Sequence, residues 1–187
     1  FKTMLVKATQ ELQIGPNDDD DYGPVINQGQ LDQMVEAIER AKADGATVVI
    51  GGGRLDDEVH QGGYYMAPTI IENAASTAAI STTELFGPIT CLYRVGDFDE
   101  AVALANESPF GLTASIHTAN IDRAMTFIGR VQSGVAVVNG ATYGSEPHMP
   151  FGGLKQSGNG TREAGTEAID VYSELKTVYI HHDETQV

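Results

Sequence analysis

The stretch that decides the fold runs from residue 90 to residue 138 and reads TCLYRVGDFDEAVALANESPFGLTASIHTANIDRAMTFIGRVQSGVAVV. Three runs in it are rich in strand-forming residues: Thr90–Val95, Thr113–His117 and Val135–Val138. Two helical patterns separate these runs, and the links between them are short. Strands that alternate with helices in this way predict an α/β fold, with a parallel sheet and flanking helices.

Helix signals mark both separating segments. Asp97 followed by Glu100 forms a capping-box-like start for the first helix. Asn120 can cap the second helix. The apolar residues of that second helix recur at helical spacing: Ile121, Ala124, Met125, Ile128 and Val131. We therefore expect two amphipathic helices between the three strands.

Similar patterns continue on both sides of this stretch. The remaining expected helices cover residues 1–12, 31–41 and 162–171, and the remaining expected strands cover 47–50, 64–71 and 177–182. Gly15 and Gly45 are placed to end the first two of these helices. A Gly- and Pro-rich loop from Asn139 to Gly160 leaves the carboxyl end of a strand. In parallel sheets such ends carry the functional loops, so this loop is a prime candidate for a site.

Composition excludes several classes of function. The net charge of −15 repels phosphate backbones and anionic lipid, so neither nucleic acid nor a membrane surface is an expected partner. A single cysteine excludes an internal disulfide framework and fits a reducing cytoplasm. The five histidines lack metal-ligand spacing, and Asp18–Asp21 lacks the alternation of a calcium loop, so no metal is expected. The start at Phe1 shows neither an initiator Met nor a signal peptide, which predicts a piece of a longer chain.

Two short motifs carry the functional information: Glu84-Leu85-Phe86-Gly87-Pro88, and Pro150-Phe151-Gly152-Gly153 leading into Lys155-Gln156-Ser157-Gly158. A carboxylate can accept two hydrogen bonds from the vicinal hydroxyls of a ribose, and Phe86 offers an apolar face to a flat ring. Taken alone, the first motif also fits a surface Glu and a core Phe that flank a turn.

In this order and spacing the motifs resemble the C-terminal part of the aldehyde dehydrogenase superfamily. Further matching segments lie along almost the whole chain: Tyr22-Gly23-Pro24, 62–69, 105–112, 134–139 and Lys176-Thr177-Val178. The resemblance implies an aldehyde dehydrogenase catalytic-domain-like fold. Residues 1–170 would form part of the catalytic domain, and residues 171–187 would form an oligomerisation strand and tail, a C-terminal strand arm that assembles a homodimer or homotetramer.

The resemblance also assigns roles to individual residues. Glu84 would hold the nicotinamide ribose of NAD or NADP, and Phe86 would pack beside the nicotinamide. Phe151 would form an aromatic wall of the substrate tunnel. Tyr143 and His148 would edge the tunnel entrance, although an ordinary exposed loop is an equal alternative for these two.

Glu163 follows the segment Ser157-Gly158-Asn159-Gly160-Thr161-Arg162, which has one residue, Thr161, beyond the usual family pattern. By resemblance, Glu163 matches a buried family glutamate that takes part in proton relay. A buried carboxylate there would need partners or a raised pKa. A structural ion pair with a basic neighbour is the alternative.

The family oxidises an aldehyde to a carboxylic acid through a cysteine thiohemiacetal, from which hydride passes to the cofactor. By resemblance, the nucleophilic Cys, the general-base Glu and the oxyanion-hole Asn belong upstream of Phe1. Cys91 lies inside a predicted strand, where the family has no catalytic residue, and a structural thiol is the favoured interpretation. We therefore expect a fragment of a cytoplasmic NAD(P)-dependent oxidoreductase that is inactive alone.

Two other functions are compatible with the sequence. One is a non-catalytic truncated module that acts in oligomer assembly through the terminal strand. The other is a hydrolase that depends on Cys91. The choice between NAD and NADP, the identity of the aldehyde and the use of coenzyme A as acceptor are not specified by these residues.

Overall fold

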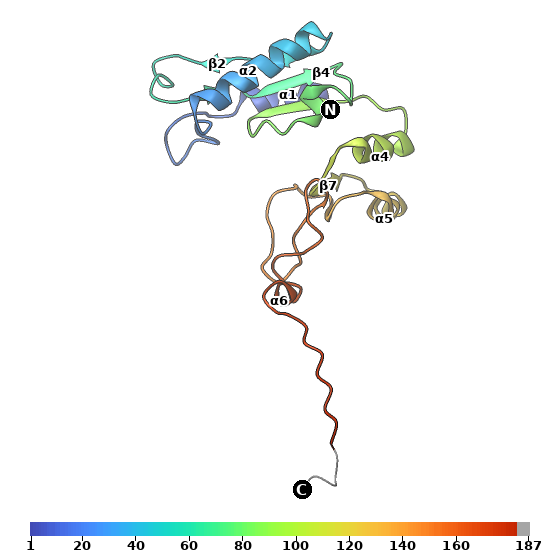
Figure 1. Ribbon diagram of the computed structural model, residues 1–187. Helices are drawn as coiled ribbons and strands as arrows, with labels where there is room; N and C mark the ends of the chain where they lie inside the picture. Colours follow the sequence, from blue (N-terminus) through green and yellow to red (C-terminus); the bar gives the residue numbers. More distant parts are fainter. Residues whose placement is uncertain (183–187) are drawn as a thin grey trace. The chain divides into compact units, whose positions relative to one another are not determined.

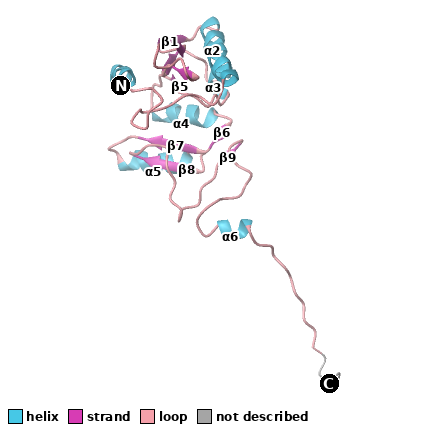
Figure 2. Ribbon diagram, turned by 90° about the vertical axis from the view of Figure 1, so that its left-hand side faces the viewer, coloured by secondary structure: helices cyan, strands magenta, loops and turns pink. Residues whose placement is uncertain are grey.

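The computed structural model describes residues 1–182, and this part of the chain divides into two units, Phe1–Ser108 and the described residues from Pro109 onward (Figure 1). Each unit combines helices with short strands (Figure 2). The expected α/β class is therefore confirmed. The expected sheet is divided, because the strands form one three-stranded and three two-stranded sheets among the described residues.

The main sheet of the first unit has the strand order β1-β4-β5. Its strands are β1 (Thr47–Ile50), β4 (Thr69–Glu72) and β5 (Ile89–Leu92). β4 and β5 are parallel, as expected, whereas β1 runs antiparallel to β4 with an irregularity between Val48 and Ile50. The sheet is therefore mixed, with one parallel and one antiparallel pair of strands.

Helix α2 (Gln28–Ala43) packs against this sheet (Figure 1). It begins at Asn27, whose side chain accepts a hydrogen bond from the backbone N–H of Gln30 at 2.9 Å. It ends before Gly45, whose φ of +96° suits glycine. The core that it forms consists of Leu31, Met34, Ile38, Ala41, Met66, Ile71 and Ile80. The segment 31–41, in which a helix was expected, thus supplies the face that α2 buries, namely Leu31, Met34, Ile38 and Ala41.

Smaller elements complete the first unit. They are α1 (Lys2–Gln10), the antiparallel pair β2 (Arg54–Leu55) and β3 (Tyr65–Met66), α3 (Ala79–Thr82) and α4 (Phe98–Glu107). The cap of α4 is close to the expected one. The Asp97 carboxylate accepts a hydrogen bond from the Glu100 N–H at 2.8 Å. The Glu100 carboxylate accepts one from the N–H of Gly96, one residue before the cap, at 2.6 Å.

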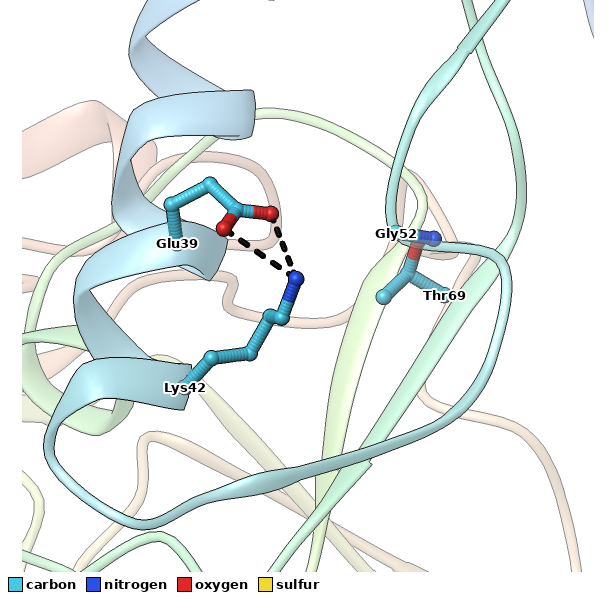
Figure 3. Close-up of polar contacts among 4 residues, drawn as sticks. All are labelled: Glu39, Lys42, Gly52 and Thr69. Atoms are coloured by element: carbon cyan, nitrogen blue, oxygen red, sulfur yellow. Dashed lines mark hydrogen bonds and ion pairs between the residues drawn. The ribbon is translucent and has the colours of Figure 1, made fainter.

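The strand expected over residues 64–71 is divided into β3 and β4, because Pro68 has no N–H for a ladder. The buried Thr69, which follows this break, binds the backbone of the turn after β1 (Figure 3). Its hydroxyl accepts a hydrogen bond from the Gly52 N–H at 2.8 Å and donates one to the Ala67 carbonyl at 2.7 Å. The exposed side of α2 carries a different kind of contact, an ion pair between Glu39 and Lys42 at 2.8 Å (Figure 3).

The second unit contains two small sheets. β7 (Thr113–Ile116) and β8 (Val135–Val138) are parallel, and α5 (Ile121–Arg130) connects them. β6 (Phe110–Gly111) pairs antiparallel with β9 (Leu154–Lys155). The Asn120 cap of α5 is confirmed at 3.0 Å to the Arg123 N–H. The helix buries Ala124 and Phe127, whereas most of the predicted stripe, namely Ile121, Met125 and Ile128, is exposed.

Two predictions for the C-terminal part differ from the structure. The helix expected over 162–171 is wrong except for α6 (Ala168–Val171), because Ala164 and Gly165 adopt positive φ angles of 62° and 66°. The expected strand over 177–182 pairs with no strand within residues 1–182 and is not formed there. A strand needs a hydrogen-bonded neighbour, and the described part of the chain supplies none. The rest of the predicted tail, 183–187, lies outside the described residues.

Candidate functional site

The loop 84–88 of the first unit joins α3 to β5 and is held at the start of the parallel strands. The Thr69 N–H of β4 donates to the Pro88 carbonyl at 2.8 Å, and the Ile89 N–H donates to the Gly87 carbonyl at 2.8 Å. Leu85 packs against the α2 core. These contacts leave the side chains on either side of Leu85 exposed, so that Glu84 and Phe86 face solvent.

Glu84 and Phe86 line the same hollow, which has a volume of about 480 Å³. Its other polar lining residues include Ser81, Thr83 and Tyr93. This volume lies within the usual range of roughly 300–1,000 Å³ for small-molecule sites. Phe86 is 76% exposed, so it is not the core residue that one interpretation of the motif proposed.

The chemistry of this hollow suits a ribose attached to a flat ring. The carboxylate of Glu84 has only acceptors and can bind two hydroxyls at once. The exposed ring of Phe86 can pack against an apolar or aromatic face. Within residues 1–182 no cluster of His, Cys, Asp and Glu could hold a metal ion. The residues present therefore fit the sugar and ring of a nicotinamide cofactor.

Cys91 lies in β5 on the wall of this hollow and is half-buried. Burial raises the pKa of its thiol, while hydrogen bonds with Tyr93 and Ser81 act in the opposite direction. The Tyr93 hydroxyl also donates a hydrogen bond to the Ser81 hydroxyl. A thiol with a raised pKa is protonated at neutral pH and is a poor nucleophile. Cys91 therefore has the properties of a structural thiol.

Ser81 and Tyr93 were not among the residues selected from the sequence. Tyr93 follows Cys91 by two positions, so an extended backbone places both side chains on one face. The spacing of Cys91 and Tyr93 could therefore have indicated Tyr93 from the sequence. Ser81 could not be found in this way, because its place beside Tyr93 depends on how α3 packs against β5.

In the second unit, the candidate residues Phe151 and Glu163 pair with each other. The Phe151 N–H donates to the Glu163 carbonyl at 2.8 Å, and the Glu163 N–H donates to the Phe151 carbonyl at 2.9 Å. In an antiparallel pair of this kind the two side chains project to the same side of the bridge. The structure thus brings together the predicted tunnel wall and the predicted proton-relay carboxylate.

Glycines allow the loop that carries Phe151 to pass close to other backbone segments. A Cβ atom on Gly134 would lie 1.6 Å from the Gly152 carbonyl oxygen. A Cβ atom on Gly153 would lie 2.3 Å from the Ser157 carbonyl oxygen. Real Cβ atoms do not approach oxygen so closely, so these positions require glycine. Close backbone packing therefore explains why glycine follows Phe151 in this motif.

The expectation of a buried Glu163 is wrong for this chain, because its side chain is exposed. The alternative, an ion pair with a basic neighbour, is also absent within residues 1–182. The adjacent Arg162 binds backbone instead, with Nη1 donating to the Thr161 carbonyl at 2.8 Å and to the Gly153 carbonyl at 3.3 Å. Tyr143 is 88% exposed and His148 is also exposed, as the open-loop interpretation predicted.

The sequence of residues 1–178 matches the aldehyde dehydrogenase family. The chain is 39% identical over 182 residues to alpha-ketoglutaric semialdehyde dehydrogenase of Bacillus subtilis. The aligned region covers 96% of this chain and 37% of that protein. It is 39% identical over 183 residues to betaine aldehyde dehydrogenase of Brucella anthropi, with the same coverage of 96% and 37%. The chain thus spans little more than a third of the length of these curated relatives.

Solved structures show the same relationship. The fold matches a crystal structure of betaine aldehyde dehydrogenase from Staphylococcus aureus in complex with NAD+, with a TM-score of 0.87 and 29% identity, over 91% of this chain and 34% of that chain. The chain belongs to the aldehyde dehydrogenase family. None of the helices in residues 1–182 combines the length and apolar character needed to cross a membrane.

Proposed function

We propose that this chain is a fragment of an NAD(P)-dependent aldehyde dehydrogenase that oxidises an aldehyde to a carboxylic acid. The observation that carries the proposal is the shared hollow of Glu84 and Phe86, which presents a free carboxylate beside an exposed aromatic ring. Family membership and the NAD+ bound in the Staphylococcus aureus enzyme support it. When bound, the cofactor would accept the hydride that leaves the aldehyde.

In this proposal each residue has a limited task. Glu84 accepts hydrogen bonds from the two hydroxyls of the nicotinamide ribose and thereby orients the ring. Phe86 packs beside the nicotinamide and shields it from water. Phe151 provides an apolar wall for the aldehyde, and Tyr143 and His148 edge its entrance. The exposed Glu163 can exchange a proton with solvent, as a relay carboxylate must.

The bond-making step needs groups that these 187 residues do not supply. Cys91 is unsuited to attack an aldehyde, because its pKa is raised and its side chain is partly buried in β5. We propose that the nucleophilic Cys, the general-base Glu and the oxyanion-hole Asn are contributed by another part of the parent enzyme. The 187-residue chain alone would then have no aldehyde dehydrogenase activity.

The proposal is tested by separating binding from turnover. The purified chain is titrated with nicotinamide mononucleotide, which carries the ribose and ring but not the adenosine half. Wild-type chain is compared with Glu84→Gln. The amide keeps the shape of the carboxylate but has one acceptor oxygen instead of two and carries no charge. We expect amide signals of residues 84–93 to shift on titration, and Glu84→Gln to bind about tenfold more weakly, since one charged hydrogen bond is lost.

Glu58→Gln is the control, because Glu58 is an exposed carboxylate outside the hollow. Binding that is equal in Glu84→Gln and wild type would exclude the ribose role. Turnover is measured with betaine aldehyde and alpha-ketoglutaric semialdehyde in the presence of NAD or NADP. Reduction of either cofactor by the chain alone would contradict the proposed absence of the nucleophile.

A second candidate function, oligomer assembly, is favoured by the segment after Tyr172. Four of its large side chains are exposed, namely Leu175, Val178, Tyr179 and Ile180, and no strand pairs with it in residues 1–182. Such a segment can add to the edge of a partner sheet. We propose that it joins copies of the parent enzyme into a homodimer or homotetramer.

Light scattering after size-exclusion chromatography tests this second function. We expect the full chain to self-associate with rising concentration, and a chain ending at Lys176 to stay monomeric. A full chain that is strictly monomeric at high concentration would exclude assembly through this segment alone.

A further inference from the structure

We propose that Gln30 is a positioning residue for the loop 84–88, through its hydrogen bond to the Leu85 carbonyl. By holding that carbonyl, Gln30 keeps Phe86 in a left-handed backbone conformation and so places its ring beside Glu84. The inference rests on the proposed function where it concerns the cofactor, but its structural part stands without it.

The contact joins two distant parts of the first unit. The Gln30 side-chain amide donates to the Leu85 carbonyl oxygen at 2.6 Å, across 55 positions of sequence. The backbone of Gln30 is fixed in turn, because its N–H donates to the Asn27 cap at 2.9 Å. Gln30 therefore extends from the rigid first turn of α2 and not from a mobile loop.

The position of the bonded carbonyl decides what the contact can do. The Leu85 carbonyl and the Phe86 N–H belong to one planar peptide unit. The φ angle of Phe86 is the rotation between this plane and the rest of Phe86. That angle is +50°, a left-handed conformation that is strained for a bulky L-residue. Such a residue stays there only when its surroundings hold it.

A second contact of α2 lies on the other side of Phe86. A Cβ atom on Gly87 would lie 2.4 Å from both Sδ and Cε of Met34, which is fully buried. Met34 follows Gln30 by four positions, so both side chains lie on the same face of the helix. Helix α2 thus contacts the loop immediately before and immediately after Phe86.

The consequence is visible in the exposure of Phe86. Its neighbours Leu85 and Ile89 pack against the α2 core, while the Phe86 ring itself is directed outward and lines the hollow with Glu84. A large apolar ring gains nothing from water, so its exposed position is imposed by the backbone. Without the Gln30 contact, Phe86 would relax to a negative φ and its ring would leave the position beside Glu84.

The decisive variant is Gln30→Met, which removes the donor, has a similar length and has a similar helix propensity. Gln33→Met is the matched control, since Gln33 is an exposed glutamine on the same helix. Gln30→Asn, with an amide that is one methylene too short to reach, repeats the test if the methionine variant does not fold. Each variant is studied in the 187-residue chain.

The first readout is the set of three-bond couplings across the N–Cα bond of Phe86, which depend on φ. The second is amide exchange at Ile89, whose N–H donates to the Gly87 carbonyl. Gln30→Met should shift the couplings away from the left-handed values and accelerate Ile89 exchange about tenfold. Gln33→Met should leave both unchanged. Unchanged couplings in both Gln30 variants would overturn the proposal.

Titration with nicotinamide mononucleotide separates this inference from the proposed function. If wild-type chain binds the mononucleotide, Gln30→Met should weaken binding about tenfold while Glu84 is still present. If Gln30→Met changes the Phe86 couplings and binds as tightly as wild type, the link to the cofactor is refuted. If wild-type chain binds nothing, the proposed function fails, and the couplings alone decide the role of Gln30.

Discussion

Phe151 and Glu163 exchange two backbone hydrogen bonds, at 2.8 and 2.9 Å, and so close the Gly-rich segment between them into a loop. Both residues were candidates for the site from the sequence, but as members of separate motifs. Their pairing places the two side chains on one side of the bridge. The loop depends on close backbone contacts, and these contacts give the first prediction.

Gly134→Ala should strongly destabilise the second unit. Its Cβ would lie 1.6 Å from the Gly152 carbonyl oxygen, so either β8 or the loop must move. We expect a loss of about 3 kcal/mol in the free energy of unfolding, typical of overpacking against backbone. Urea denaturation followed by the amide signals of β7 and β8 measures this loss.

Gly129→Ala is the control for this prediction. Gly129 lies in α5 with nothing within 4 Å of the added Cβ. Alanine should therefore stabilise the helix by about 0.5–1 kcal/mol. Equal effects of the two substitutions would show that the Gly134 contact with Gly152 is not tight in solution.

Thr69→Val should destabilise the first unit. The Thr69 hydroxyl accepts a hydrogen bond from the N–H of Gly52, which lies beside it (Figure 3). It also donates one to the Ala67 carbonyl, and the residue is only 2% exposed. Valine keeps the shape but leaves the Gly52 donor without an acceptor. We expect a loss of about 1–3 kcal/mol by urea denaturation. Thr90→Val, at an exposed position of β5, should change stability by less than about 0.5 kcal/mol.

His60 should make the stability of the first unit depend on pH. Its Nδ1 lies 2.8 Å from an Asp57 carboxylate oxygen and its Nε2 lies 3.0 Å from the Ile14 carbonyl oxygen. Both partners are acceptors, so only the doubly protonated imidazolium satisfies both contacts. The hydrogen bond with Asp57 is the main cause that raises the pKa of His60, with further contributions from Ile14 and from the charge of Asp20.

The direction of the pH effect follows from this raised pKa. The contribution of His60 is complete below its unfolded pKa of about 6.5 and is lost as the pH rises through the higher folded value. For Asp57, the hydrogen bond with His60 lowers the pKa below the ordinary 3.8, so its contribution is lost only as the pH falls through that lowered value. The pair therefore stabilises the fold most between the two unfolded pKa values, 3.8 for Asp57 and 6.5 for His60.

The pH prediction is checked by titrating the His60 ring signals and by measuring unfolding from mildly acidic to mildly alkaline pH. His60→Gln should remove the loss of stability on the alkaline side. His117→Gln, at an exposed position of the second unit, should leave it in place. A folded His60 pKa below the unfolded value would refute the imidazolium assignment.

Local signals explain which parts of the fold could be predicted from sequence. The bounds of β1 and β8 are those of the predicted strand-forming runs, and α2 was found because its helical pattern ends at Gly45. The helix expected over 162–171 failed because Glu163 pairs with Phe151, which lies outside the predicted segment, and because Ala164 and Gly165 adopt positive φ angles. Tertiary pairing there overrides local helix propensity.

The residues of the candidate site also differ in whether local sequence signals could predict them. Glu84 and Phe86 were found because they belong to one contiguous motif. Gln30 could not be found, since only the packing of α2 shows that it reaches the Leu85 carbonyl. The exposure of Glu163 was also not predictable, because burial is a property of the neighbours and not of the residue itself.

Cys91 should react slowly with alkylating reagents in the folded chain. Its thiol is half-buried in β5, and burial raises its pKa, so little thiolate is present at neutral pH. We expect alkylation by iodoacetamide to be slower than for free cysteine, because the raised pKa leaves less thiolate and the half-buried side chain is less accessible. In denaturant the rate should approach that of free cysteine.

A substitution beside Cys91 provides a second test of its reactivity. Hydrogen bonds from Tyr93 and Ser81 lower the pKa of the thiol and so oppose the effect of burial. Tyr93→Phe should therefore slow alkylation further, provided that circular dichroism shows an unchanged fold. Tyr64→Phe, a change of the same kind away from Cys91, should have no effect on the rate. Alkylation of the folded chain as fast as in denaturant would refute the structural-thiol assignment and revive a Cys91-dependent hydrolase.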